Sequence, residues 1–289
     1  MTYVLLAAAC SVLVSVLLKL AGRRGIDAGQ MVTWNYLVAA LLCALLLDAP
    51  LDSLRQPDAA WVPLLVLAVV LPSLFLVLAA SVRAAGIVRT DIAQRLSLLL
   101  SLLAAFLWFG ESANGVKLAG LGLGLLSVLA ILARPQSVAT HPVSAQAAAW
   151  PLLLTVWIGF ALVDVMLKQI AAAGTPFAAS LQVSFVLAFV GMLLVQAWRQ
   201  SRGHSLFSWR NTGAGLLLGL LNFGNIVFYV HAHRALPENP SLVFAAMNIG
   251  VVVLGTLVGV LAFSEKPGRM NWLGIALAVP AIVLIALSR

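Results

Sequence analysis

The sequence predicts an all-α integral membrane protein with ten transmembrane helices, arranged as two inverted repeats of five helices. The first observation is composition: of 289 residues, 63% are hydrophobic and 9% are charged, whereas soluble domains have roughly 45–50% apolar and 25% charged residues. The second is a series of apolar runs of about 20 residues, the length at which a helix crosses a bilayer. The third is a helical hairpin motif that occurs twice.

Hydropathy and the Pro, Gly and charged residues between the apolar runs divide the chain into ten helices. We expect them at residues 2–21, 30–47, 61–83, 90–109, 116–133, 150–172, 176–198, 212–235, 240–263 and 270–288.

The repeated hairpin consists of an apolar helix, a short polar turn containing Glu, and a second apolar helix that begins just before a Gly. Its two copies are Phe109-Gly110-Glu111 with Gly120, and Phe263-Ser264-Glu265 with Gly274. The apolar segments upstream correspond in the same order, and Ser15–Lys19 in the first helix matches Asp164–Lys168 in the sixth. Repeats of this kind indicate an architecture before any local detail is considered.

We therefore predict a first repeat at residues 1–134, a connecting loop at 135–149 and a second repeat at 150–289. Five helices is an odd number, so the second repeat must enter the membrane from the opposite side. Inverted repeats are typical of secondary transporters, which bind substrate near the bilayer midplane and expose the site alternately to each side.

With these features the chain resembles the EamA-type branch of the drug/metabolite transporter superfamily. The resemblance rests on the two five-helix repeats, the Glu turn after helices 4 and 9, the following Gly, and the Lys late in helices 1 and 6. It implies a basket of helices 1–4 and 6–9 around a central cavity, with helices 5 and 10 outside. It also implies export or exchange of a small metabolite, without specifying which one.

Other functional classes find no support in the sequence. We find no phosphate loop, nucleophile elbow or Cys and His spacing for a metal, and so expect no enzyme, no metal and no cofactor. The net charge of +8 comes from Lys and Arg in short loops, where they orient helices, so no nucleic-acid partner is expected. Twelve of the 17 basic residues follow odd-numbered helices. This bias predicts both termini outside, whereas the family resemblance implies both inside.

Helix 8 carries the clearest polar pattern. Asn222, Asn225, Tyr229 and His233 have the spacing i, i+3, i+7 and i+11, so they share one helix face within about 80°. We expect this stripe to line a substrate cavity. Hydrogen bonding between helices is the alternative.

Two further helices place charged residues at membrane depth. In helix 6, Asp164 and Lys168 share a face with Trp157. They form either a structural ion pair or a site at which Asp164 binds a substrate amine or a coupling proton. In the first repeat, Lys19 and Asp91 are further candidates for charge coupling, and the alternative for Lys19 is that its ammonium group extends to the membrane interface.

Helix 4 begins with Asp91, Gln94 and Arg95, and the repeat aligns Gln94 with Asn248. Arg95 either binds a substrate carboxylate or phosphate, or lies at the interface in an i,i+4 pair with Asp91. Trp34 in helix 2 and Gln182 in helix 7 are further candidates for substrate contact, although aromatic residues are more often interfacial anchors.

The remaining motifs are interpreted as structural. Glu111 and Glu265 are expected to pair locally or to cap the next helix. The Gly-x-x-x-Gly spacings are expected to pack helices within the monomer, with a dimer face as the alternative. They are Gly120/Gly124, Gly215/Gly219 and Gly255/Gly259.

The sequence thus favours an inner-membrane secondary transporter, a monomer or homodimer, that exports an amino acid or similar zwitterion by alternating access. Its expected partners are the small-molecule substrate, the lipid bilayer and a coupling proton. An anionic sugar nucleotide or phosphorylated metabolite is the alternative substrate. A lipid-flipping or non-transporting membrane partner of the same fold is the alternative class.

Overall fold

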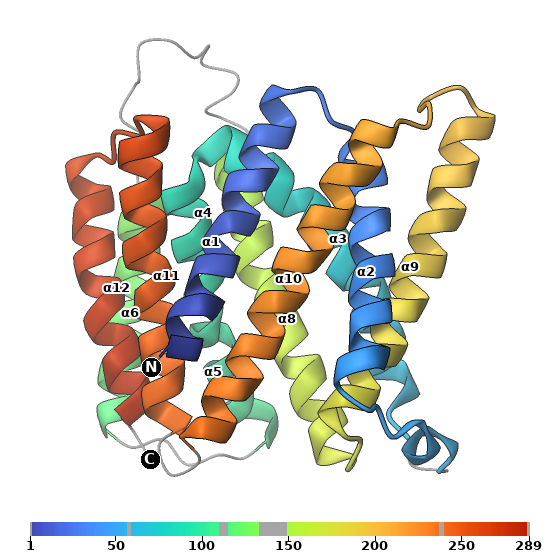
Figure 1. Ribbon diagram of the computed structural model, residues 1–289. Coiled ribbons are helices and arrows are strands. Elements are labelled where there is room, and N and C mark those ends of the chain that lie inside the picture. The colour runs from blue at the N-terminus through green and yellow to red at the C-terminus, as the bar shows by residue number, and fades with distance from the viewer. Residues whose placement is uncertain (1, 57–58, 110–114, 133–148, 237–239, 288–289) are drawn as a thin grey trace.

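The computed structural model describes residues 2–56, 59–109, 115–132, 149–236 and 240–287, and all regular elements in these ranges are helices (Figure 1). In chain order they are α1 (Thr2–Arg23), α2 (Ala28–Leu46), the short 3₁₀ helix η1 (Leu51–Arg55), α3 (Trp61–Ala85), α4 (Ile87–Arg95), α5 (Leu98–Phe109), α6 (Gly115–Leu132), α8 (Ala149–Ala172), α9 (Phe177–Ser201), α10 (Trp209–Ala235), α11 (Pro240–Phe263) and α12 (Arg269–Leu287).

Seven of the described helices are long and apolar enough to cross a membrane: α1, α2, α3, α8, α9, α10 and the Val243–Phe263 part of α11. Shorter apolar segments occupy Leu118–Ser127 in α6 and Arg269–Ile285 in α12. Many large apolar side chains point outward, among them Leu45 and Leu194, which are 74% and 66% exposed. Such an apolar exterior is what lipid tails require of a helical membrane protein. The predicted all-helical class is confirmed.

The fourth predicted helix, residues 90–109, is wrong in one respect, because the structure breaks it into α4 and α5 at Leu96 and Ser97. Ser97 folds back on Gln94, with its hydroxyl 2.7 Å from the Gln94 carbonyl oxygen. The indole N–H of Trp157 in α8 donates to the Leu96 carbonyl at 2.8 Å. A helix break at membrane depth is tolerated when a neighbouring helix supplies such a partner.

The helices form a bundle in which α1, α4 and α8 lie near the middle and α11 lies on the left, next to α12 (Figure 1). On one side α2, α3, α9 and α10 pack together, and on the other side α6 packs against α12. The helices α1, α9 and α11 all end at the upper end of the bundle in Figure 1, where α2, α4, α10 and α12 begin. We call this the upper end below.

The expected packing role of the Gly-x-x-x-Gly motifs within the monomer is confirmed. At each of the six glycines, an added Cβ would come closer than 3.0 Å to a residue of another helix. Gly219 of α10, for example, would meet Val38 of α2 at 2.5 Å. The small residues therefore let α2 and α10, α4 and α11, and α6 and α12 approach each other closely.

A candidate substrate cavity between the two halves

Two adjoining cavities lie between the first half of the chain and the second. The first has a volume of about 250 Å³ and the second about 210 Å³. Gln94, Arg95, Phe160 and Asn225 line both cavities, so the two meet at the C-terminal end of α4. We call the second cavity the polar compartment and the first the apolar compartment.

The polar compartment contains an acid and a base from different helices. Arg95 ends α4 and Asp164 lies in α8, and both line this compartment together with Tyr229 and Asn248. Asp164 Oδ2 accepts a hydrogen bond of 2.8 Å from the hydroxyl of Ser101 in α5, just beyond the helix break. The break thus brings a polar group of α5 to the carboxylate of α8.

Arg95 and Asp91 do not form with each other the i,i+4 ion pair that was one of the two alternatives for Arg95, since each bonds to a serine of α1 instead. Arg95 Nη2 donates to Ser11 Oγ at 2.5 Å, and Ser15 Oγ donates to Asp91 Oδ1 at 2.7 Å. The reason is geometric, because α1 and α4 run in opposite directions. Ser11 therefore faces Arg95, and Ser15, one turn later in α1, faces Asp91, one turn earlier in α4. Arg95 Nε has no hydrogen-bond partner among the described residues.

The polar stripe of α10 reaches the cavities over three of its four residues. Asn222 lines the apolar compartment, Asn225 lines both compartments and Tyr229 lines the polar one. Asn222 also donates to Asn35 of α2 at 3.2 Å, and Asn225 donates to the Ala7 carbonyl of α1 at 2.8 Å. The residues of this stripe therefore both line the cavities and form hydrogen bonds between helices.

His233, the fourth residue of the stripe, lines neither cavity. Its Nδ1 lies 3.0 Å from the Tyr229 carbonyl oxygen, and the two rings are in edge contact with centroids 4.4 Å apart. His233 is thus placed to support Tyr229 from behind.

The apolar compartment has an aromatic wall. Tyr36, Phe75, Phe160, Phe177 and Phe185 line it, with leucines of α3, α8 and α9. Tyr36 is 1% exposed and packs edge-on against Phe75. Its hydroxyl has no hydrogen-bond partner within the described part of the chain.

The other predicted site residues lie in varied places. Asn248 lines the polar compartment and donates to the Phe244 carbonyl at 2.9 Å. Trp34 lies outside both cavities, at the contact of α2 with Gly215 of α10. Gln182 and Lys168 also line neither cavity, and Gln182 Oε1 is buried without a hydrogen-bond partner in the described ranges.

Lys19 and Glu265 form an ion pair with each other, so Glu265 pairs with a distant residue rather than locally. Glu265 also accepts hydrogen bonds from the backbone N–H groups of Ile87 and Val88, at 2.8 and 3.2 Å. It therefore caps the N-terminus of α4 rather than α12, where an anion is favoured by the helix dipole. The other turn glutamate, Glu111, lies outside the described residues.

Gly86 makes this contact possible. It precedes α4 with φ of 87°, and an added Cβ would lie 2.7 Å from Glu265 Oε2. Both the positive φ and the close approach of the carboxylate favour glycine at this position.

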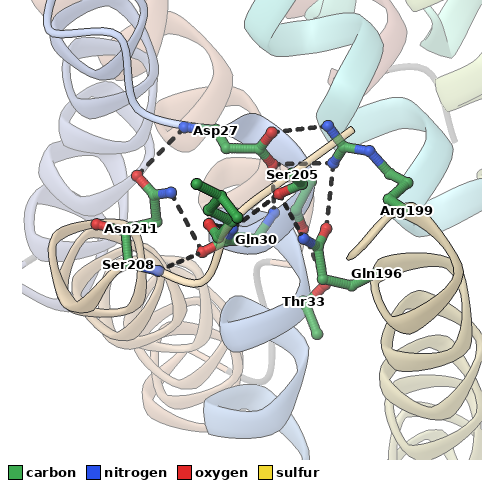
Figure 2. Close-up of polar contacts among 10 residues, drawn as sticks. Asp27, Gln30, Thr33, Gln196, Arg199, Ser205, Ser208 and Asn211 are labelled. Carbon is green, nitrogen blue, oxygen red and sulfur yellow. Dashed lines mark hydrogen bonds and ion pairs between the residues drawn. The ribbon is translucent and has the colours of Figure 1, made fainter. Parts of the chain in front are cut away.

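A second polar cluster joins the two halves at the upper end (Figure 2). Asp27 caps α2 and receives two hydrogen bonds from Arg199 of α9, Nη1 to Oδ1 at 3.0 Å and Nη2 to Oδ2 at 2.7 Å. Gln30 extends the cluster by donating to Ser205 at 2.9 Å and accepting from Asn211 of α10 at 3.2 Å. We call this group, with Gln196 and Ser208, the upper-end cluster.

Burial raises the pKa of Asp27, but the hydrogen bonds from Arg199 and from the Gln30 backbone lower it by more. The pKa of Asp27 consequently lies below its ordinary value. The carboxylate is therefore ionised and paired at neutral pH.

Sequence reasoning did not identify Ser11, Ser15 and Ser101 as partners of the charged residues, nor the upper-end cluster. Small hydroxyl residues are common in membrane helices and carry no distinguishing signal. Asp27 did have one, because an Asp two residues after a Gly and just before an apolar run is a favoured N-cap.

Comparison with known proteins is consistent with this arrangement. A model of the EamA-like transporter family matches residues 1–133. An uncharacterized protein of Haemophilus influenzae (strain ATCC 51907 / DSM 11121 / KW20 / Rd) is 40% identical over 281 residues, covering 94% of this chain and 93% of that protein. One crystal structure aligns with 98% of this chain and 96% of its own, at a TM-score of 0.54 and 18% identity, which is a likeness of fold. The chain belongs to the EamA-like transporter family of multi-pass membrane proteins.

Proposed function

We propose that this protein is a secondary transporter of a small zwitterion with an apolar side chain, such as an amino acid. The observation that carries the proposal is that Arg95 and Asp164 line the same polar compartment, which adjoins an aromatic one. An arginine binds a carboxylate through two parallel hydrogen bonds, and an aspartate binds an ammonium group. The aromatic compartment then receives the side chain.

The cavities fit a large anion less well. Among the described residues that line them, Arg95 is the one basic side chain. Lys19 lies outside the cavities and forms an ion pair with Glu265. Pockets for drug-sized ligands have volumes of about 300–1,000 Å³, whereas the larger cavity here has about 250 Å³. A sugar nucleotide would need more space and more positive charge.

Alternating access is supported by the symmetry of the helix contacts between the two halves: corresponding helices make equivalent contacts. If α1, α2, α3, α4 with α5, and α6 correspond to α8, α9, α10, α11 and α12, the largest contacts between the halves have counterparts. The contact of α1 with α10 matches that of α3 with α8, and α2 with α10 matches α3 with α9. Three corresponding pairs, α2 with α9, α4 with α11 and α6 with α12, contact each other directly. A two-fold relationship of inverted repeats produces this pattern.

The upper end has the features of a closed gate. The Lys19–Glu265 pair and the Asp27–Arg199 pair both connect the first half to the second there. From the charge bias of the loops we propose that this end faces the cytoplasm, and we propose the inner membrane as the location. Export is the direction that the family resemblance favours.

Counterflow in proteoliposomes tests the proposal. Purified protein is reconstituted with unlabelled amino acid inside, and entry of labelled L-leucine, L-phenylalanine, L-aspartate, L-lysine and a sugar phosphate is followed. We expect saturable exchange of leucine and phenylalanine, reduced at least tenfold by Arg95→Gln and by Asp164→Asn.

Asp52→Asn and Arg55→Gln are matched controls, because this exposed pair in η1 lies outside both cavities. They should exchange like the wild type. Exchange of the sugar phosphate alone would favour the anionic substrate. Absence of any exchange by folded protein, together with scrambling of labelled lipid, would replace the proposal with the lipid-flipping alternative.

A further inference from the structure

We propose that Asp91 is a proton-binding site that couples substrate movement to a proton gradient. This inference rests on the proposed transport function. Asp91 lies in α4 one turn before Arg95, is 3% exposed and lines neither cavity. A proton can therefore bind to Asp91 without competing with substrate for space.

Only one oxygen of the Asp91 carboxyl group is hydrogen-bonded in the described part of the structure. Oδ1 accepts from Ser15 at 2.7 Å, whereas Oδ2 is buried without a partner. Oδ2 lies against Gly255 of α11, where an added Cβ would be 2.5 Å away. An ionised carboxylate usually needs several donors when buried, so this environment leaves room for the neutral form.

The charges around Asp91 oppose one another. Arg95 on the same helix attracts the ionised carboxylate, and Glu265, which follows α11, repels it. Lys19 of α1 forms an ion pair with Glu265. Asp164 of α8 is also attracted by the positive charge of Arg95. From α3, Ser81 supplies a hydroxyl that bonds to Thr90 rather than to Asp91. Arg95 is therefore the cation among these groups that favours ionised Asp91, in addition to the hydrogen bond from Ser15.

This dependence on Arg95 links the proton to the substrate. In the empty protein, the positive charge of Arg95 stabilises ionised Asp91. When a substrate carboxylate neutralises Arg95, Asp91 loses that support and takes up a proton from water. By reciprocity, a proton on Asp91 strengthens substrate binding at Arg95. Proton and substrate therefore bind together and move in the same direction, so export of substrate down its own gradient carries a proton out with it.

The sign of the pH dependence separates Asp91 from Asp164. Coupling through Asp91 makes substrate affinity fall as pH rises, by up to about tenfold per pH unit for one linked proton. Protonation of Asp164 would remove the partner of the substrate ammonium group, so it would weaken binding as pH falls.

The test uses purified full-length protein and labelled L-leucine and L-phenylalanine. Affinity is measured from pH 5.5 to 8.5, and proton uptake on binding is measured with an indicator dye in weak buffer. We expect wild-type affinity to fall with pH and binding to take up a proton. Asp91→Asn should keep counterflow but lose both effects. Ser15→Ala removes the donor to the ionised carboxylate and should shift the pH midpoint upward.

His233→Gln is the matched control, since His233 is an ionisable residue of α10 that lines neither cavity. It should keep the wild-type pH profile. Retention of the wild-type profile by Asp91→Asn would overturn the inference. So would wild-type exchange without pH dependence or proton uptake, which would leave the proposed transport function intact. Absence of all exchange would instead refute the transport function. If Asp91→Asn does not fold, an unshifted Ser15→Ala profile would overturn the inference.

Discussion

Arg199 holds Asp27 through two parallel hydrogen bonds, of 3.0 Å and 2.7 Å, and so joins α9 of the second half to the start of α2 in the first. Their side chains are 28% and 26% exposed, whereas those of the Arg55–Asp52 pair are 86% and 90% exposed. A paired fork of this kind is stronger than a surface ion pair because its geometry is fixed and its charges are partly shielded from water.

The first prediction concerns stability. Arg199→Gln should lower the free energy of unfolding by about 1–3 kcal/mol, since it leaves a partly buried carboxylate without its charged donor. The measurement is denaturant or thermal unfolding in detergent. Arg55→Gln, the exposed counterpart, should change stability little. Equal effects of the two substitutions would show that the upper-end cluster contributes no more than a surface pair.

The second prediction concerns pH. The pKa of Asp27 is lowered in the folded protein, so its ionised form stabilises the fold at pH values above its unfolded pKa of about 4. This stabilisation should be lost as pH falls from there through the lower folded pKa. The difference in unfolding free energy between the wild type and Asp27→Asn should shrink over that range. A difference that stays constant below pH 4 would contradict the assignment.

The third prediction concerns the closed end. Glu265→Gln weakens both the ion pair to Lys19 and the anionic cap of α4. In a background without Cys10 and Cys43, Ser11→Cys in the cavity should then react faster with a membrane-impermeant thiol reagent added at the upper end.

Two controls make this test specific. Asp52→Asn should leave the labelling rate unchanged. The charge swap Lys19→Glu with Glu265→Lys should not restore closure, because the N-terminus of α4 requires a negative charge. Full restoration by the swap would mean that the ion pair alone holds the end closed.

The fourth prediction concerns the helix break. Trp157→Phe removes the N–H that satisfies the Leu96 carbonyl, leaving that oxygen without its partner at a cost of about 1–3 kcal/mol. Trp150→Phe on the same helix, where the side chain is 55% exposed, is the control and should be nearly neutral. Unfolding in detergent compares the two. Equal stabilities would show that the Trp157 N–H is not needed at the break.

The sequence by itself determined the membrane class, the ten helical segments and the family. Composition and run length are local properties, and lipid permits few structures other than helices. The sequence also indicated that Asn222, Asn225 and Tyr229 share a face, because a helical period is fixed by backbone geometry. The structure places all three on the cavities.

Only the tertiary structure decided which groups become partners. Lys19 and Glu265 are 246 residues apart in the chain, and Glu265 also accepts a hydrogen bond from the N-terminus of α4, which lies between them in sequence. Local spacing favoured the pairing of Asp91 with Arg95, yet packing of α1 against α4 gave each of them a serine. The break between α4 and α5 depends likewise on an indole from α8. A polar group in a membrane protein bonds to whichever partner the packing of the helices brings within reach, and that partner is often far away in sequence.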